Sequence, residues 1–198
     1  LGLSFALAPG EAFYVPLARG GNGSLDAAAV LGRLGPLLED EKLEKAGHNL
    51  KFGQVVLARN GVWPRGLAFD AMVASFLLGE GGGARPVEGS LSLRWLVSRR
   101  LCVEMPERDP AGGRRRGAQL AMEEITPDPD PSALAPFACA DAGMALRLRS
   151  VLEPELERLG MTKLFRDIEM PLLSVLARME MNGVAIDVVV IALVLHKP

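Results

Sequence analysis

The segment Gly47-His-Asn-Leu-Lys-Phe-Gly53 runs from the end of a predicted strand into a predicted helix. Residues 46 to 49 are typical of a short strand end, and residues 50 to 60 have helical spacing that Gly61 closes. Further along the chain, Phe137-Ala-Cys-Ala-Asp141 places an aromatic ring and a carboxylate on one helical face, at positions i and i+4. An aromatic hydroxyl and a carboxylate in this arrangement can orient a water molecule on a metal ion, but Phe137 has no hydroxyl.

The residues around these two segments predict further strands and helices. Strands are predicted at residues 1–7, 12–17 and 63–69, the first two as a hairpin across Ala8-Pro9-Gly10. The other predicted helices are one capped near Ser24, one at 70–78, one at 90–101, one with apolar residues from Leu134 to Leu152, and one carrying Phe165, Ile168, Leu172, Val175, Leu176 and Met179 on one face. This order predicts an α/β or α+β chain with helices against a mixed sheet.

Composition limits the class of protein. The chain has 198 residues, of which 49% are apolar, and a net charge of −2, values that exclude a disordered, collagen-like or disulfide-rich chain. Cys102 and Cys139 are too few and too far apart for a metal knuckle or a disulfide framework. The longest apolar run, 188–195, is far shorter than the roughly 20 residues that span a bilayer. We therefore predict a cytoplasmic protein with no membrane partner.

Histidine catalysis has little support, because the chain holds two histidines and His196 lies in an apolar tail. His48 is interpreted as a loop or sheet-edge residue. Residues 106 to 131 are rich in proline, glycine and charge, and are interpreted as a long surface connection. Within it, Arg114, Arg115 and Arg116 form the most basic spot of the chain. They can hold a phosphate backbone by charge and forked hydrogen bonds; a solvated loop is the alternative.

The two opening segments, in this order, resemble the 3′-to-5′ proofreading exonuclease domain of bacterial DNA polymerase I, of the family A polymerases. Other stretches resemble the family in the same order along nearly the whole chain. These stretches are 1–10, Tyr14-Val-Pro16, 36–42, Gly66-Leu-Ala-Phe-Asp-Ala-Met72, Ser90-Leu91 with Trp95-Leu96, and Ile168-Glu-Met-Pro-Leu-Leu173 through Asn182-Gly-Val184.

The resemblance implies a ribonuclease-H-like 3′-5′ exonuclease fold, a mixed central sheet flanked by helices, here incomplete at its N-terminal strand. It implies an exonuclease-like domain at 1–160, a helix and turn at 161–187 leading toward a polymerase module, and a divergent apolar tail at 188–198. It also implies a two-metal mechanism, in which four carboxylates hold two Mg²⁺ ions, or Mn²⁺ or Zn²⁺, about 3.5 to 4 Å apart. The substrate implied is the 3′ end of single-stranded DNA.

The family's ligands carry over incompletely onto this chain. The first motif, an Asp-x-Glu, would lie before Leu1. The aspartate of the second motif falls on Gly53, and the tyrosine of the third motif falls on Phe137, so Asp141 is the one ligand that remains. Asp70 resembles a structural position of the family. A single carboxylate does not fix two divalent ions, so we expect a degenerate metal site that does not bind Mg²⁺ stably.

Three hypotheses of function follow. The first is a nuclease-derived domain of a DNA polymerase I, in DNA replication and repair, that has a degenerate site, positions a polymerase module and touches single-stranded DNA through residues 114–116. The second is an active exonuclease of the same family whose Asp-x-Glu lies upstream. Gly53 argues against this second hypothesis, because it has no side chain to bind a metal ion. The third is a non-enzymatic interaction or remnant protein without a nucleic-acid role.

Overall fold

The structure is a computed structural model that describes residues 2–18, 25–80, 91–106 and 131–184. Its elements are β1 (Gly2–Ala8), β2 (Glu11–Ala18), β3 (Leu25–Asp26), α1 (Ala27–Glu39), β4 (Lys45–Gly47), α2 (Leu50–Ala58), β5 (Leu67–Asp70), α3 (Ala71–Leu77), α4 (Leu93–Leu101), α5 (Pro131–Arg158), α6 (Thr162–Leu164), the π-helical turn η1 (Phe165–Glu169) and α7 (Met170–Asn182). The mixed α/β composition that we predicted is confirmed.

The first two strands form the predicted hairpin. β1 and β2 pair antiparallel, with Ser4 opposite Tyr14 and Phe5 opposite Phe13. Gly10 makes the turn with a positive φ of 85°, a backbone conformation that glycine adopts without strain. The short strand β3 then pairs parallel to the end of β2.

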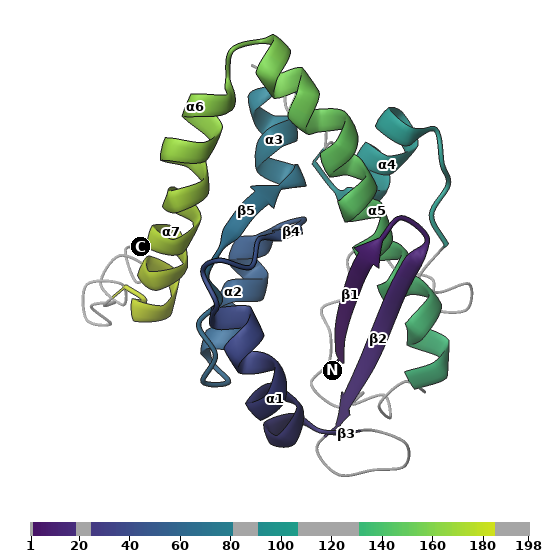
Figure 1. Cartoon of the computed structure of the whole chain (residues 1–198), viewed down its shortest axis with the longest axis vertical. Coiled ribbons are helices and arrows are strands. Elements are labelled where there is room, and N and C mark those ends of the chain that lie inside the picture. Colours follow the sequence, from purple (N-terminus) through teal and green to yellow (C-terminus); the bar gives the residue numbers. More distant parts are fainter. Residues whose placement is uncertain (1, 19–24, 81–90, 107–130, 185–198) are drawn as a thin grey trace, which may run out of the picture.

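The strands make two sheets, whereas we predicted one mixed central sheet. β1, β2 and β3 form one sheet, and β4 and β5 form a second, parallel sheet. Among the described residues, no strand pairs with the outer edge of β1 or of β4, so no backbone hydrogen bonds join the two sheets. Helix α5 contacts β1, β2 and β4, and Figure 1 shows it running past both sheets. Packing on this helix therefore connects the two parts.

Side-chain caps fix where three helices begin. Asp26, and not the predicted Ser24, caps α1, and its carboxylate accepts a hydrogen bond from the Ala29 amide at 2.8 Å. Both residue types are good caps, so the local sequence did not distinguish them. Asp70 caps α3 as the predicted start at residue 70 requires, and Ser92 caps α4 two residues after the predicted start.

The core lies in the second part of the chain, between β5, α3, α4, α5 and η1. Its fully buried members include Phe69, Leu96, Leu148, Leu152 and Leu156. The Phe69 ring meets the Phe165 ring at a centroid distance of 5.3 Å. These contacts hold α5 against β5 and η1, so the position of α5 is set by apolar packing.

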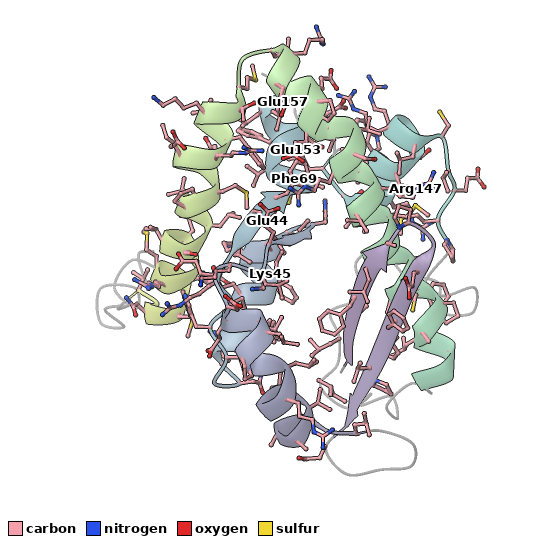
Figure 2. The ribbon with its side chains drawn as sticks, viewed as in Figure 1. Glu44, Lys45, Phe69, Arg147, Glu153 and Glu157 are labelled. Atoms are coloured by element: carbon pink, nitrogen blue, oxygen red, sulfur yellow. The ribbon has the colours of Figure 1, made fainter. Side chains whose placement is uncertain are left out.

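A chain of charged side chains closes the edge of this core. Arg149 on α5 donates to Glu44 and to Glu153, both at 2.9 Å, and Arg166 of η1 donates to Glu153 at 2.9 Å. Figure 2 shows Glu44, Phe69 and Glu153 along the seam between the second sheet and α5. The network connects β4, α5 and η1 where the apolar contacts end.

The last helix turns its more apolar side outward, which contradicts the predicted face. Of the six residues predicted on that face, Phe165 is buried, but Ile168, Leu172, Val175, Leu176 and Met179 are exposed. Met170, Leu173 and Ala177 face the interior instead. α7 packs on α2, where Gln54 donates a hydrogen bond to the Ser174 hydroxyl at 3.0 Å and Lys51 pairs with Glu180. The buried residues Met170, Leu173 and Ala177, together with these polar contacts, therefore set the orientation of this helix.

Parts of the predicted organisation fall outside the described residues. Residues 107–130, which hold most of the predicted surface connection, and the predicted tail at 188–198 are among them. The division predicted at residue 160 stays a prediction. Within the described ranges, no helix is long and apolar enough to cross a membrane.

Candidate active site

Gly53 lies one turn into α2. The helix starts after Asn49, which has a left-handed backbone with φ 56° and ψ 51°. Leaving aside the chain neighbours and the backbone of its own helix, no atom of the described residues lies within 4 Å of the position that a Cβ would take on Gly53. A larger side chain therefore fits at this position without displacing a neighbour.

Asp70 fixes the start of the same helix from the end of β5. Its carboxylate accepts hydrogen bonds from the amides of Asn49 at 3.1 Å and Leu50 at 2.7 Å. It also accepts from Met72 at 2.8 Å and Val73 at 3.4 Å at the start of α3. The side chain is completely buried. Since both oxygens serve backbone amides, the arrangement agrees with the structural interpretation of Asp70.

His48 lies in the short loop between β4 and α2, as the interpretation of a loop or sheet-edge residue predicted. Burial lowers the pKa of His48 below its ordinary value of 6.5, and the negative charges of Asp70 and Asp141 act in the opposite direction. Its Nδ1 is buried and has no hydrogen-bond partner among the described residues. The sequence did not predict that the charge of Asp141 acts on His48, because Asp141 lies on a helix that is distant in the sequence.

Phe137 and Asp141 lie one turn apart on α5, and both are partly exposed. α5 contacts β4, and the charge of Asp141 acts on the pKa of His48 at the β4–α2 junction. The structure thus brings Asp141 toward the segment that carries Gly53. Residues Arg114, Arg115 and Arg116 lie outside the described residues, so the predicted basic spot is not placed.

The donor set does not fit a two-metal centre. In the described part of the chain, no group of three or more histidine, cysteine, aspartate or glutamate side chains is placed to hold a metal ion. Gly53 supplies no ligand, and Asp70 is committed to four amides. Mg²⁺ prefers several oxygen ligands in octahedral geometry, which one aspartate does not provide.

The mixed α/β architecture, with a helix-borne aspartate beside a strand–helix junction, is that of the ribonuclease-H-like 3′-5′ exonuclease class. A family model described as 3′-5′ exonuclease matches residues 2–157. This chain therefore belongs to the 3′-5′ exonuclease family of the family A DNA polymerases, as its sequence resemblance indicated.

Curated relatives agree with this assignment. The chain is 40% identical over 195 residues to DNA polymerase I of Pseudomonas aeruginosa, covering 94% of this chain and 20% of the relative. It is 35% identical over 157 residues to DNA polymerase I of Rhizobium leguminosarum, covering 79% of this chain and 14% of the relative. The chain thus spans a fifth or less of the length of these relatives.

Solved structures show the same fold. The chain matches the structure described as the POL domain of Pol1 from M. smegmatis in complex with DNA primer-template and dNTP, with a TM-score of 0.66, 23% identity and coverage of 93% of this chain and 26% of that one. It also matches NrnC of Brucella melitensis, with a TM-score of 0.60, 22% identity and coverage of 88% and 72%.

Proposed function

We propose that this chain is the 3′-5′ exonuclease-type domain of a DNA polymerase I whose metal site is degenerate, so that the chain by itself does not hydrolyse DNA. Gly53 carries the proposal. It occupies the position that resembles the second-motif aspartate, and the space around it is open. Hydrolysis by two metal ions needs carboxylates to hold both ions and to offset the charge of the phosphorane, and Asp141 alone does not do this.

The test is a metal titration by calorimetry together with digestion of a labelled single strand. We expect the chain to give no saturable heat with Mg²⁺ and no magnesium-dependent shortening from the 3′ end. Shortening well above a buffer control, lost in Asp141→Asn, would contradict the proposal and favour an active exonuclease.

A matched pair of variants separates loss of the ligand from loss of the fold. The double variant Gly53→Asp with Phe137→Tyr returns one carboxylate and one hydroxyl, and Gly53→Asn with Phe137→Tyr has the same size without the charge. We expect Mn²⁺ to bind more tightly to the first than to the second. Neither should digest DNA, because the Asp-x-Glu of the first motif, which the resemblance places before Leu1, does not contribute ligands here. Equal Mn²⁺ affinities would mean that residue 53 does not face the metal position.

The proposal includes contact with single-stranded DNA through Arg114, Arg115 and Arg116. Binding by these residues should weaken with salt, and their triple alanine variant should flatten that dependence. Filter binding at two salt concentrations measures both effects. No binding at low salt would favour a protein without a nucleic-acid role.

The proposal also includes an architectural role, in which the domain positions a polymerase module. The outward side of η1 and α7 supports it, since Ile168 of η1 and Val175 and Met179 of α7 are each more than half exposed, at 57%, 52% and 61%. Covering such a stripe removes apolar surface from water. In a longer chain that includes the module, α7 amides should exchange hydrogen more slowly than in this chain. Equal exchange rates would contradict this role.

A further inference from the structure

A second basic surface lies on the other side of α2, outside the candidate active site. Here the segment leading into β5 faces η1 and α7, and Figure 1 shows α7 beside α2 and β5. Between them is a cleft of about 380 Å³. Its lining includes the side chains of Trp63, Arg65, Arg166, Ser174, Arg178 and Glu41.

The cleft is positively charged in a chain that is acidic overall. Arg65, Arg166 and Arg178 face one carboxylate in the lining, that of Glu41. Arg166 already donates to Glu153, but in the described part of the chain no carboxylate pairs with Arg65 or Arg178. Two guanidinium groups without an acidic partner at one concave surface favour an anion with several oxygen acceptors.

Trp63 gives the cleft an aromatic wall. The Arg178 guanidinium carbon lies 5.2 Å from the centroid of the Trp63 ring. Guanidinium groups and tryptophan rings in one groove are the side chains that hold single-stranded nucleic acid, the first by the phosphates and the second by contact with a base. A site for an acidic peptide would need the positive charge of the guanidinium groups but not the tryptophan ring.

Hydrogen bonds hold the two walls in place. Gln54 is 1% exposed, and its amide donates to the Pro64 carbonyl at 3.2 Å and to the Ser174 hydroxyl at 3.0 Å. The Trp63 amide donates to the Glu39 carboxylate at 2.8 Å. Because these bonds fix both walls before a ligand enters, little order has to be gained on binding.

We propose that this cleft binds single-stranded nucleic acid, with Arg65 and Arg178 on successive phosphates and Trp63 against a base. The ligand class rests on the function proposed above, but the residues are different from Arg114, Arg115 and Arg116. The cleft would guide a strand past α7.

The chain has two tryptophans, so Trp95→Phe leaves Trp63 as the only reporter. Titration of that variant with a 12-nucleotide oligo(dT) should quench the fluorescence of Trp63 to saturation. In anisotropy measurements, Arg65→Ala with Arg178→Ala should weaken binding of the oligonucleotide by about tenfold or more, and should reduce the salt slope by about 1.4, about 0.7 for each phosphate contact on a single strand. Arg178→Lys keeps the charge and should keep the slope.

Arg99→Ala is the matched control, because Arg99 lies 5.4 Å from the ring centroid of Trp95 in a pair of the same kind outside the cleft. It should bind as the original chain does. Thermal melts should show that all variants are folded. Unchanged binding in the double variant, while the triple variant of residues 114–116 loses binding, would overturn the cleft and leave the proposed function standing. Arginine-dependent binding of poly-glutamate without binding of oligo(dT) would also overturn it, in favour of an acidic peptide.

Discussion

Asp70 and Gly53 both lie near the first turn of α2, but they contribute differently to the stability of the fold. Asp70 is completely buried and accepts hydrogen bonds from four backbone amides, so two helices depend on it. Outside its own helix, no described atom lies within 4 Å of the place that a Cβ would take on Gly53. A carboxylate at Gly53 would serve only the chemistry, and its absence costs the fold nothing. The architecture therefore depends on the carboxylate of Asp70 and not on a side chain at position 53.

The largest effect is expected at Asp70. Asp70→Ala leaves four amides without acceptors in the interior and removes the cap of α3, so we expect a loss of about 3 to 5 kcal/mol of the free energy of unfolding. Asp141→Ala, the same change on partly exposed α5, should cost about 1 kcal/mol or less. Urea denaturation measures both. Equal losses would mean that the contrast between the two carboxylates is wrong.

At Gly53 we expect the opposite sign. Gly53→Ala lies inside a helix with open space around it, and it should raise the free energy of unfolding by about 0.5 to 1 kcal/mol because alanine loses less backbone entropy than glycine. Gly66→Ala is the contrasting variant. There φ is 65° and a Cβ would lie 2.6 Å from the Leu43 carbonyl oxygen, so it should destabilise the chain. A loss of stability at Gly53 would show that the space is not open.

A smaller effect is expected from His48, which lies between β4 and α2. Its pKa is lowered in the folded chain, so the unfolded chain takes up this proton at higher pH. The contribution of neutral His48 is therefore complete above pH 6.5 and declines as the pH falls below that value. His48→Gln should reduce the slope of stability against pH between 7 and 5. Denaturation curves at several pH values test this, and an unchanged slope would contradict it.

The smallest effect is expected at Glu153. Burial opposes its ionisation, but hydrogen bonds from Arg149 and Arg166 outweigh burial and place the pKa of Glu153 below its ordinary value of 4.5. The stability from this carboxylate is present above pH 4.5 and is lost as the pH falls toward the lowered pKa. Glu153→Gln should flatten the acid limb of the stability profile, and an acid limb as steep as that of the original chain would show that the network contributes little.

Local signals predicted the elements well. Turn residues predicted the β1–β2 hairpin, and helical spacing over residues 70–78 predicted α3. The division into two sheets and the outward face of α7 were not predicted, because both depend on which distant segments meet. An apolar stripe in the sequence indicates a helix face that can be buried, but it does not identify the segment that buries it. Gly53 and Asp141 were identified through the family resemblance, and the place of His48 required the tertiary structure.

The residues of the β1–β2 hairpin are less buried than those of the core around β5. No residue of β1, and none of residues 11–17 in β2, is buried, whereas Phe69 and Asp70 in β5 are completely so. A segment with few buried contacts opens at a lower free energy than the whole molecule. The hairpin and the β4–β5 core should therefore behave as two cooperative units that separate along α5, with the hairpin fraying first while the other unit stays closed.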